Sequence, residues 1–188
     1  MMRPLSRFLK RLGLDQRGVS AVEFAFIAPV MILFYFGMVE TCQIMMAERR
    51  TVRAASAIAD LVAQAPGQIT VTGTGGINDI FEIADTLMTP FVTGTDLKVC
   101  LLSIVSDNNN VKTVDWRQVK NAAACPADGA TVTDVPAGLM SANQSLVMAR
   151  VTYSYSGAAN KVIKVNPSFT RTFYLRPRRS FKIECSTC

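Results

Sequence analysis

The chain has 188 residues, a length that favours one modest domain with an anchor, and 49% of the residues are hydrophobic. It contains no histidine, which excludes histidine-dependent nucleophilic catalysis and His-ligated zinc, so we do not expect an enzyme. The formal net charge is +6, of which residues 1–18 supply +4 through five basic residues and one acidic residue. The remaining +2 is too small for nucleic acid to be the expected partner.

Residues 1–18 form a basic leader that is followed directly by an apolar run. The positive charge of the leader indicates a cytoplasmic flank. The stretch from Phe24 to Val39 has no charged residue and spans roughly 24 Å as a helix, and a start at Val19 lengthens it to roughly 31 Å. That length matches a hydrocarbon core of about 30 Å. The sequence therefore predicts a transmembrane helix over residues 19–47.

Glu23 lies at the beginning of this helix, where a charge is unfavourable. A carboxylate inside hydrocarbon is rare and usually functional, because it needs a partner to offset the loss of its hydration. A cut between Gly18 and Val19 would create such a partner, a new α-amino group. The same cut would make Glu23 the fifth residue of the mature chain.

Three other kinds of apolar N-terminal segment compete with this interpretation. A secretory signal peptide has a shorter apolar core and small residues at its cleavage site, whereas Glu40 and Gln43 follow this run. Glu40 also argues against a lipoprotein signal at Cys42. An uncleaved signal anchor explains the hydrophobicity and the orientation, although it explains neither Gly18 nor Glu23, and it stays open.

The helical pattern continues beyond the apolar run. Apolar residues recur at helical spacing to Val62, and Pro66-Gly67 ends the pattern. The sequence predicts one helix from Val19 to about Ala65, apolar on all sides at first and amphipathic over residues 48–66. Pro29, inside the apolar part, is either an ordinary transmembrane proline or a flexible point for bending.

Residues 67–188 are predicted to form an α+β head outside the cytoplasm. Asp107 to Asn110 form a strong turn between two strand patterns, so the first two strands are expected to pair as a hairpin. In the second strand of this hairpin, strict alternation places Val114 and Trp116 on one face. The predicted elements are a linker over Gln68–Gly76, a helix over Ile77–Met88, and strands over Leu97–Val105, Val111–Val119, Leu146–Tyr155, Lys161–Val165 and Phe169–Leu175.

Short turns between these strands imply a small antiparallel sheet, and the amphipathic half of the long helix offers one apolar face to cover it. The glycine-rich stretch before the first head helix, residues 73–76, lacks the lysine of a phosphate-binding loop and is expected to be a plain loop. The fold class expected is thus α+β, a long N-terminal helix packed on a small antiparallel sheet.

Five cysteines are present, and we expect four of them to be structural. Cys42, at the membrane edge, is expected to be a buried small hydrophobe. In an exocytoplasmic head Cys100 could bond Cys125, and Cys185 could bond Cys188, but four cysteines permit three pairings and the sequence does not choose. The Cys185–Cys188 spacing also fits a redox motif, although no helix follows it. The wide, unequal spacing makes a metal site unexpected.

The basic run Arg176-Pro177-Arg178-Arg179 follows the last strand pattern. It is either a solvated strand end or a patch that contacts acidic partner subunits or lipid headgroups. Both interpretations stay open.

The N-terminal segment resembles that of TadE-like proteins, the minor pseudopilins of the tight-adherence (Flp, type IVb) pilus. The residues that carry the resemblance are Gly18, Ala21, Val22, Glu23 and Phe24. The resemblance implies cleavage between Gly18 and Val19 by a prepilin peptidase. It also implies that Glu23 and Phe24 recruit other pilin or pseudopilin subunits and the pilus assembly platform.

The same resemblance implies a single-pass protein of the bacterial inner membrane, with a cytoplasmic N-terminus, a periplasmic head, contacts with membrane lipid, and entry into a pilus used for surface attachment. No cofactor is expected. The alternative is an uncleaved, membrane-anchored periplasmic adaptor that scaffolds a secretion or pilus machine and retains residues 1–18.

Overall fold

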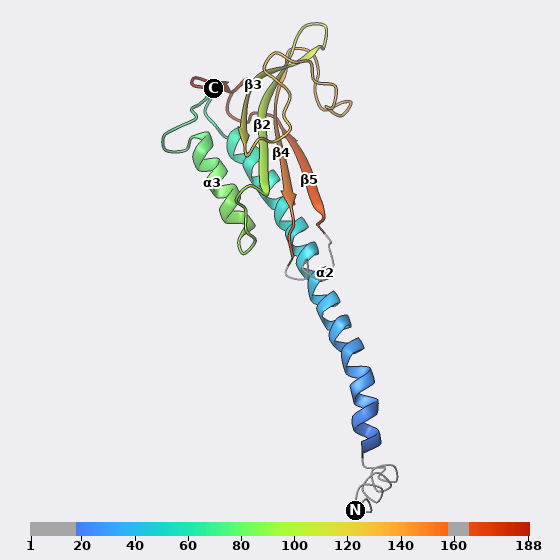
Figure 1. Cartoon of the computed structure of the whole chain (residues 1–188). Helices are drawn as coiled ribbons and strands as arrows, with labels where there is room; N and C mark the ends of the chain where they lie inside the picture. The colour runs from blue at the N-terminus through green and yellow to red at the C-terminus, as the bar shows by residue number, and fades with distance from the viewer. Residues whose placement is uncertain (1–17, 158–165) are drawn as a thin grey trace, which may run out of the picture. The chain divides into compact units, whose positions relative to one another are not determined.

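The computed structural model describes residues 18–157 and 166–188 (Figure 1). The chain divides into two compact units, Met1–Cys42 and Gln43–Cys188. The first unit contains the beginning of helix α2, and the second contains the rest of α2 and the head. Residues 1–17 of the predicted leader and the predicted strand Lys161–Val165 lie outside the described residues.

Helix α2 (Val19–Ala63) confirms the predicted long helix to within two residues of its end. Its buried residues begin at Ala47 and recur at helical spacing, as an amphipathic helix requires: Ala47, Thr51, Ala54, Ala55, Ile58, Ala59, Val62 and Ala63. The helix ends before Pro66, and Gly67 then takes a φ of +98°, a left-handed conformation that glycine adopts without steric cost.

Four strands form the main sheet of the head: β2 (Leu97–Ser106), β3 (Lys112–Lys120), β4 (Ser145–Ser154) and β5 (Ser168–Leu175). Their order is β3-β2-β4-β5, and every neighbouring pair is antiparallel (Figure 1). The predicted hairpin, β2 with β3, is confirmed. The fold is therefore α+β, with a helix packed on an antiparallel sheet.

One face of the sheet is covered by α2 and by α3 (Ile77–Met88), which has the predicted bounds. On β4 and directly after it, alternate residues from Val147 to Tyr155 join this core, as their period of two predicts. Trp116 contributes its ring to the same core and donates its indole N–H to the carbonyl of Ile183 at 2.7 Å. The C-terminal segment is thus attached to the sheet.

The opposite face carries a second, smaller core that the sequence did not predict. Loop residues Val132, Val135 and Met140 cover apolar side chains of β2 and β4. These residues lie in a segment rich in small and polar residues, and their spacing shows no helical or strand periodicity.

A bulge in β3 makes the prediction for Val114 and Trp116 wrong. Ser103 pairs with Trp116 but Ile104 pairs with Val114, so Asp115 is the extra residue. Val114 consequently packs in the second core and Trp116 in the first, on opposite faces.

The first two residues of the predicted linker are a strand. β1 (Gln68–Ile69) pairs in parallel with β6 (Glu184–Cys185) in a separate two-stranded sheet. Two residues are too few to show an alternating pattern, and their partner lies at the far end of the sequence, so only the folded chain brings them together.

The core contact of α2 predicts unequal effects of two substitutions within one turn of the helix. Ile58→Ala removes a fully buried side chain and is expected to lower the free energy of unfolding by about 2–5 kcal/mol. Leu61→Ala, at a position that is 38% exposed, is expected to cost less than about 1 kcal/mol. Denaturant unfolding of the full chain in detergent, followed by circular dichroism, measures both. Equal losses would contradict the packing described.

Candidate processing and assembly segment

Gly18 lies directly before α2, and Val19 is the first residue of the helix. Gly18 is exposed, and a Cβ added to it would meet no atom within 4 Å. Packing around this position therefore does not require a glycine. The structure supplies no reason of its own for glycine at the predicted scissile bond.

Glu23 lies four residues after Val19, so the two side chains share one face of the helix. Both are exposed, as is Phe24, whose side chain is 70% accessible. Glu23 forms no ion pair within residues 18–157 and 166–188. Any partner for this carboxylate must come from outside that part of the chain.

The helix surface beyond Glu23 is apolar on all sides and solvent-accessible. From Phe24 to Val39 none of the side chains is buried, although none carries a charge. Folded soluble proteins rarely expose so continuous an apolar surface. By length and composition α2 can cross a membrane, and it is the one such helix among the residues described.

Pro29 is accommodated within α2 without ending the helix. Its ring nitrogen cannot donate the usual bond to the carbonyl four residues earlier. Farther along, Thr41 turns its hydroxyl back to the carbonyl of Gly37 at 2.8 Å, which satisfies that hydroxyl without a partner from another element.

Residues 18–60 match the family model of TadE-like proteins. The match begins at Gly18 and includes Val19, Glu23 and Phe24, so the resemblance seen in those residues is confirmed. The TadE-like segment associates the chain with the tight-adherence pilus. It covers well under half of the 188 residues and leaves most of the head outside. No curated protein and no solved structure matches the chain significantly.

Cys42 lies within the TadE-like segment, and the prediction that it is buried is wrong. Its thiol is free and the residue is exposed. Burial within α2 begins only at Ala47, more than one helical turn later, so no core is available to cover Cys42.

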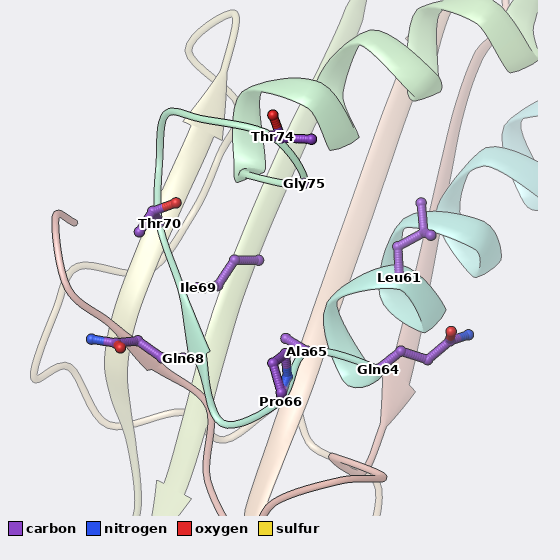
Figure 2. Close-up of a pocket in the computed structure, with 9 residues that line it drawn as sticks. All are labelled: Leu61, Gln64, Ala65, Pro66, Gln68, Ile69, Thr70, Thr74 and Gly75. Carbon is purple, nitrogen blue, oxygen red and sulfur yellow. The ribbon is translucent and has the colours of Figure 1, made fainter.

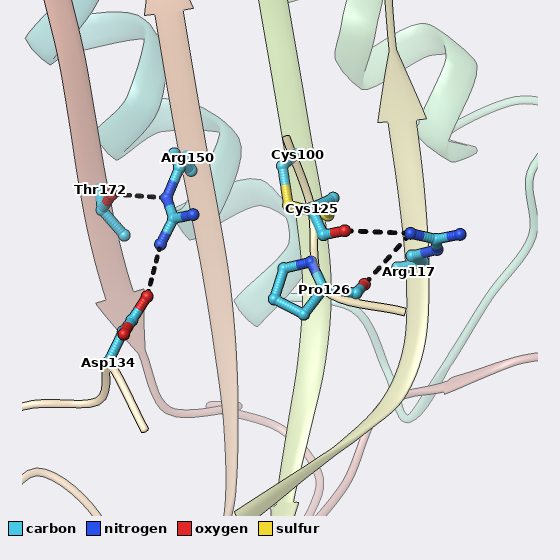
Figure 3. Close-up of a disulfide and its surroundings, with 7 residues drawn as sticks. All are labelled: Cys100, Arg117, Cys125, Pro126, Asp134, Arg150 and Thr172. Atoms are coloured by element: carbon cyan, nitrogen blue, oxygen red, sulfur yellow. Dashed lines mark hydrogen bonds and ion pairs between the residues drawn. A yellow bond between two sulfur atoms is a disulfide. The ribbon is translucent and has the colours of Figure 1, made fainter. Parts of the chain in front are cut away.

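The other four cysteines form the disulfides Cys100–Cys125 and Cys185–Cys188, each with Cα atoms 5.5 Å apart. The first joins β2 to the loop after β3 (Figure 3). Arg117 supports that loop by donating from Nη1 to the carbonyls of Cys125 at 3.0 Å and Pro126 at 3.3 Å. The fold thus selects one of the three pairings that the sequence left open.

Arginines of the C-terminal basic run form hydrogen bonds and an ion pair within the head. The amide of Arg178 donates to the carbonyl of Ala63 at 2.8 Å, at the end of α2, and its guanidinium lies 2.6 Å from Asp60. Arg176 donates to the carbonyl of Leu139 at 2.9 Å. Two of the three arginines therefore hold the chain together, which is a role that neither sequence interpretation included.

The glycine-rich loop lines a pocket of about 400 Å³ near the end of α2 (Figure 2). Leu61, Pro66 and Thr74 are among its walls, and no charged residue lines it in the part of the chain that the structure describes. The amide of Gly75 is already bonded to the carboxylate of Asp79 at 2.7 Å. These features give no support to a phosphate site, as the missing lysine indicated.

Burial raises the pKa of two head tyrosines above the ordinary value. For Tyr153 the negative charge of Asp96 adds to the effect of burial, and the hydroxyl donates to the carbonyl of Val92 at 3.1 Å. For Tyr174 burial also raises the pKa, while the neighbouring Arg150 opposes the rise.

The raised pKa of Tyr153 predicts a loss of stability in alkaline solution. An unfolded tyrosine ionises near pH 10, whereas folded Tyr153 keeps its proton to higher pH, so stability present below pH 10 is lost as the pH rises above it. The unfolding temperature of the full chain in detergent, measured from pH 8 to pH 11, is expected to fall less steeply in Tyr153→Phe. Asp96→Asn is expected to weaken the dependence in part. Equal slopes in all three proteins would contradict this origin.

Proposed function

We propose that the chain is a minor pseudopilin, processed between Gly18 and Val19 by a prepilin peptidase, that takes part in assembling a tight-adherence pilus for surface attachment. The observation that carries the proposal is the match to TadE-like proteins, which begins at the residue before the proposed cut. Two features of the structure support it. Gly18 has no packing reason to be glycine, and Glu23, which forms no ion pair with the residues that the structure describes, lies at the start of an otherwise uncharged apolar surface.

Before cleavage the proposed protein crosses the inner membrane once, with its leader in the cytoplasm and its head in the periplasm. The +4 leader holds the helix at the anionic cytoplasmic surface. Cleavage removes this charge and frees the α-amino group of Val19. The role is one of assembly, and the chain is proposed to perform no catalysis.

Pairing between subunits follows from the cost of an isolated charge in lipid. The new amine of Val19 can neutralise Glu23 of a neighbouring pilin or pseudopilin subunit, and this removes much of the penalty that each group carries alone. The pair sets the axial register of adjacent helices, while Phe24 and the following apolar residues supply the packing surface. Partner subunits, the assembly platform and lipid are the proposed contacts.

The proposed cut predicts that the mature chain begins at Val19. Intact-mass measurement of the chain extracted from membranes is expected to show a start at Val19 only when the cognate prepilin peptidase is present. Gly18→Leu is expected to remain uncut, because the added side chain must be accommodated at the peptidase site. Since a Cβ added at Gly18 would meet no atom within 4 Å, the position has room for a side chain, and lost cleavage would report recognition and not misfolding.

Retention of residues 1–18 with and without the peptidase would contradict processing. That result would favour the uncleaved adaptor of a secretion or pilus machine.

The proposed pairing predicts that loss of the Glu23 carboxylate impairs assembly. Glu23→Ala is expected to leave membrane insertion intact but to reduce the amount of the chain in sheared pili by about tenfold or more, because a buried pair that loses one partner is destabilised by about 3–5 kcal/mol. Glu40→Ala removes a carboxylate near the other end of the apolar run and serves as the matched control. Normal incorporation of Glu23→Ala would refute the pairing role.

A further inference from the structure

The face of the sheet opposite the helices changes character along its strands. Near the β2–β3 turn its side chains are apolar and lie beneath the loop that carries Val132 and Met140. Toward the other end, beyond Cys100, the same face becomes polar and hydroxyl-rich. The strand register places Lys98, Thr152 and Thr170 in one row and Cys100, Arg150 and Thr172 in the next.

These two rows form the floor of a groove of about 700 Å³. Residues 122–124 and Asp134, from the loops after β3, form its walls, and the Cys100–Cys125 disulfide ties the first of these loops to the floor. A volume of this size lies within the range of about 300–1,000 Å³ that is typical of ligand sites.

Arg150 is held in position at the centre of the groove. Its Nε donates to Thr172 Oγ1 at 3.3 Å, and its Nη2 lies 3.5 Å from an Asp134 carboxylate oxygen (Figure 3). A guanidinium has five N–H donors, so these two partners orient the group and leave donors for a ligand.

Lys98 is the second cation on the floor. It is exposed and makes neither an ion pair nor a hydrogen bond with the residues described. Because Cys100 is the residue opposite Arg150, Lys98 is a diagonal neighbour of Arg150 on the adjacent strand. Diagonal neighbours lie about 7–8 Å apart, so two long cationic side chains can reach one carboxylate between them.

The threonine hydroxyls on the floor add groups that can form hydrogen bonds with a ligand. Thr152 and Thr170 bond to each other through their hydroxyls at 3.0 Å, and each hydroxyl can both donate and accept. Asp134, whose side chain is 66% exposed, adds an acceptor at the wall. A ligand that suits the groove therefore combines one negative charge with several hydroxyl groups.

We propose that this groove binds an acidic saccharide, with the carboxylate of a uronic acid between Lys98 and Arg150 and the ring hydroxyls on the threonines and Asp134. An acidic peptide matches the cations but leaves the hydroxyl row and Asp134 without suitable partners. A neutral saccharide leaves Lys98 unpaired. The inference rests on the head alone and holds whether or not the leader is cleaved.

The test uses the full-length chain in detergent micelles and a trisaccharide of galacturonic acid, with binding measured by calorimetry and by saturation-transfer NMR. Saturable binding at millimolar or lower concentration is expected. Lys98→Glu is expected to weaken it roughly tenfold or more, because it replaces an attractive charge with a repulsive one. Thr170→Val keeps the shape but removes a hydroxyl, and a loss of severalfold is expected.

Lys112→Glu is the matched control, since it makes the same change of charge at the opposite end of the strands, where Lys112 pairs with Ser106, and should leave binding unchanged. The proposal is overturned if the trisaccharide does not bind, or if Lys98→Glu and Lys112→Glu weaken binding equally. It is also overturned if a glutamate tripeptide or a neutral galactose trisaccharide binds as tightly as the acidic sugar. Unchanged unfolding temperatures of the variants exclude misfolding as the cause of lost binding.

Discussion

Alanine side chains make up much of the α2 surface that packs in the main core, and the packing of this helix against the sheet is the interaction on which the rest of the head depends. Ala54, Ala55 and Ala59 are fully buried and small, so the larger side chains of the sheet can pack near the helix backbone. Polar links lie around this contact. Glu48 pairs with Arg171 of β5, and Asp60 pairs with Arg178 after the last long strand. The helix thereby organises both the apolar centre and the ends of the head.

A different constraint acts on the beginning of the same helix. Its side chains from Phe24 to Val39 have no protein core to cover them, and an apolar surface of that length is stable only in lipid or against other apolar helices. In the proposed role, the helix passes from the first environment to the second. The proposed pairing of Glu23 with a new amine supplies what an apolar surface lacks, because apolar contact is non-directional and does not define an axial register.

The head contributes features that do not derive from the TadE-like segment. The polar half of the outer sheet face exists because loop residues Val132, Val135 and Met140 shield only the half that lies toward the β2–β3 turn. Where shielding ends, Lys98 and the threonines take the place of leucine and methionine. In the proposed role, the groove would recognise a charged carbohydrate through residues that are separate from the helix proposed to drive assembly.

Hydrophobic periodicity in the sequence was sufficient to predict the helices and strands that have strong local patterns. It predicted α2, α3, the β2–β3 hairpin and the face of β4 that packs on the helices, because amphipathic order over ten or more residues leaves few alternatives. The candidate segment was likewise visible in the chain itself, since Gly18, Glu23 and the apolar run are neighbours in sequence. The family match then confirmed the resemblance.

Tertiary structure alone decided the features that depend on residues far apart. The bulge at Asp115, the pairing of β1 with β6, the loop side of the second core and the walls of the groove each depend on residues that no local sequence pattern marks. Cys42 illustrates the same limit, because a cysteine is buried only where another element reaches it. The sequence by itself thus determined the long helix, its apolar surface and the position of the Glu23 carboxylate at its start. Long-range packing determined which polar side chains lie together on the sheet.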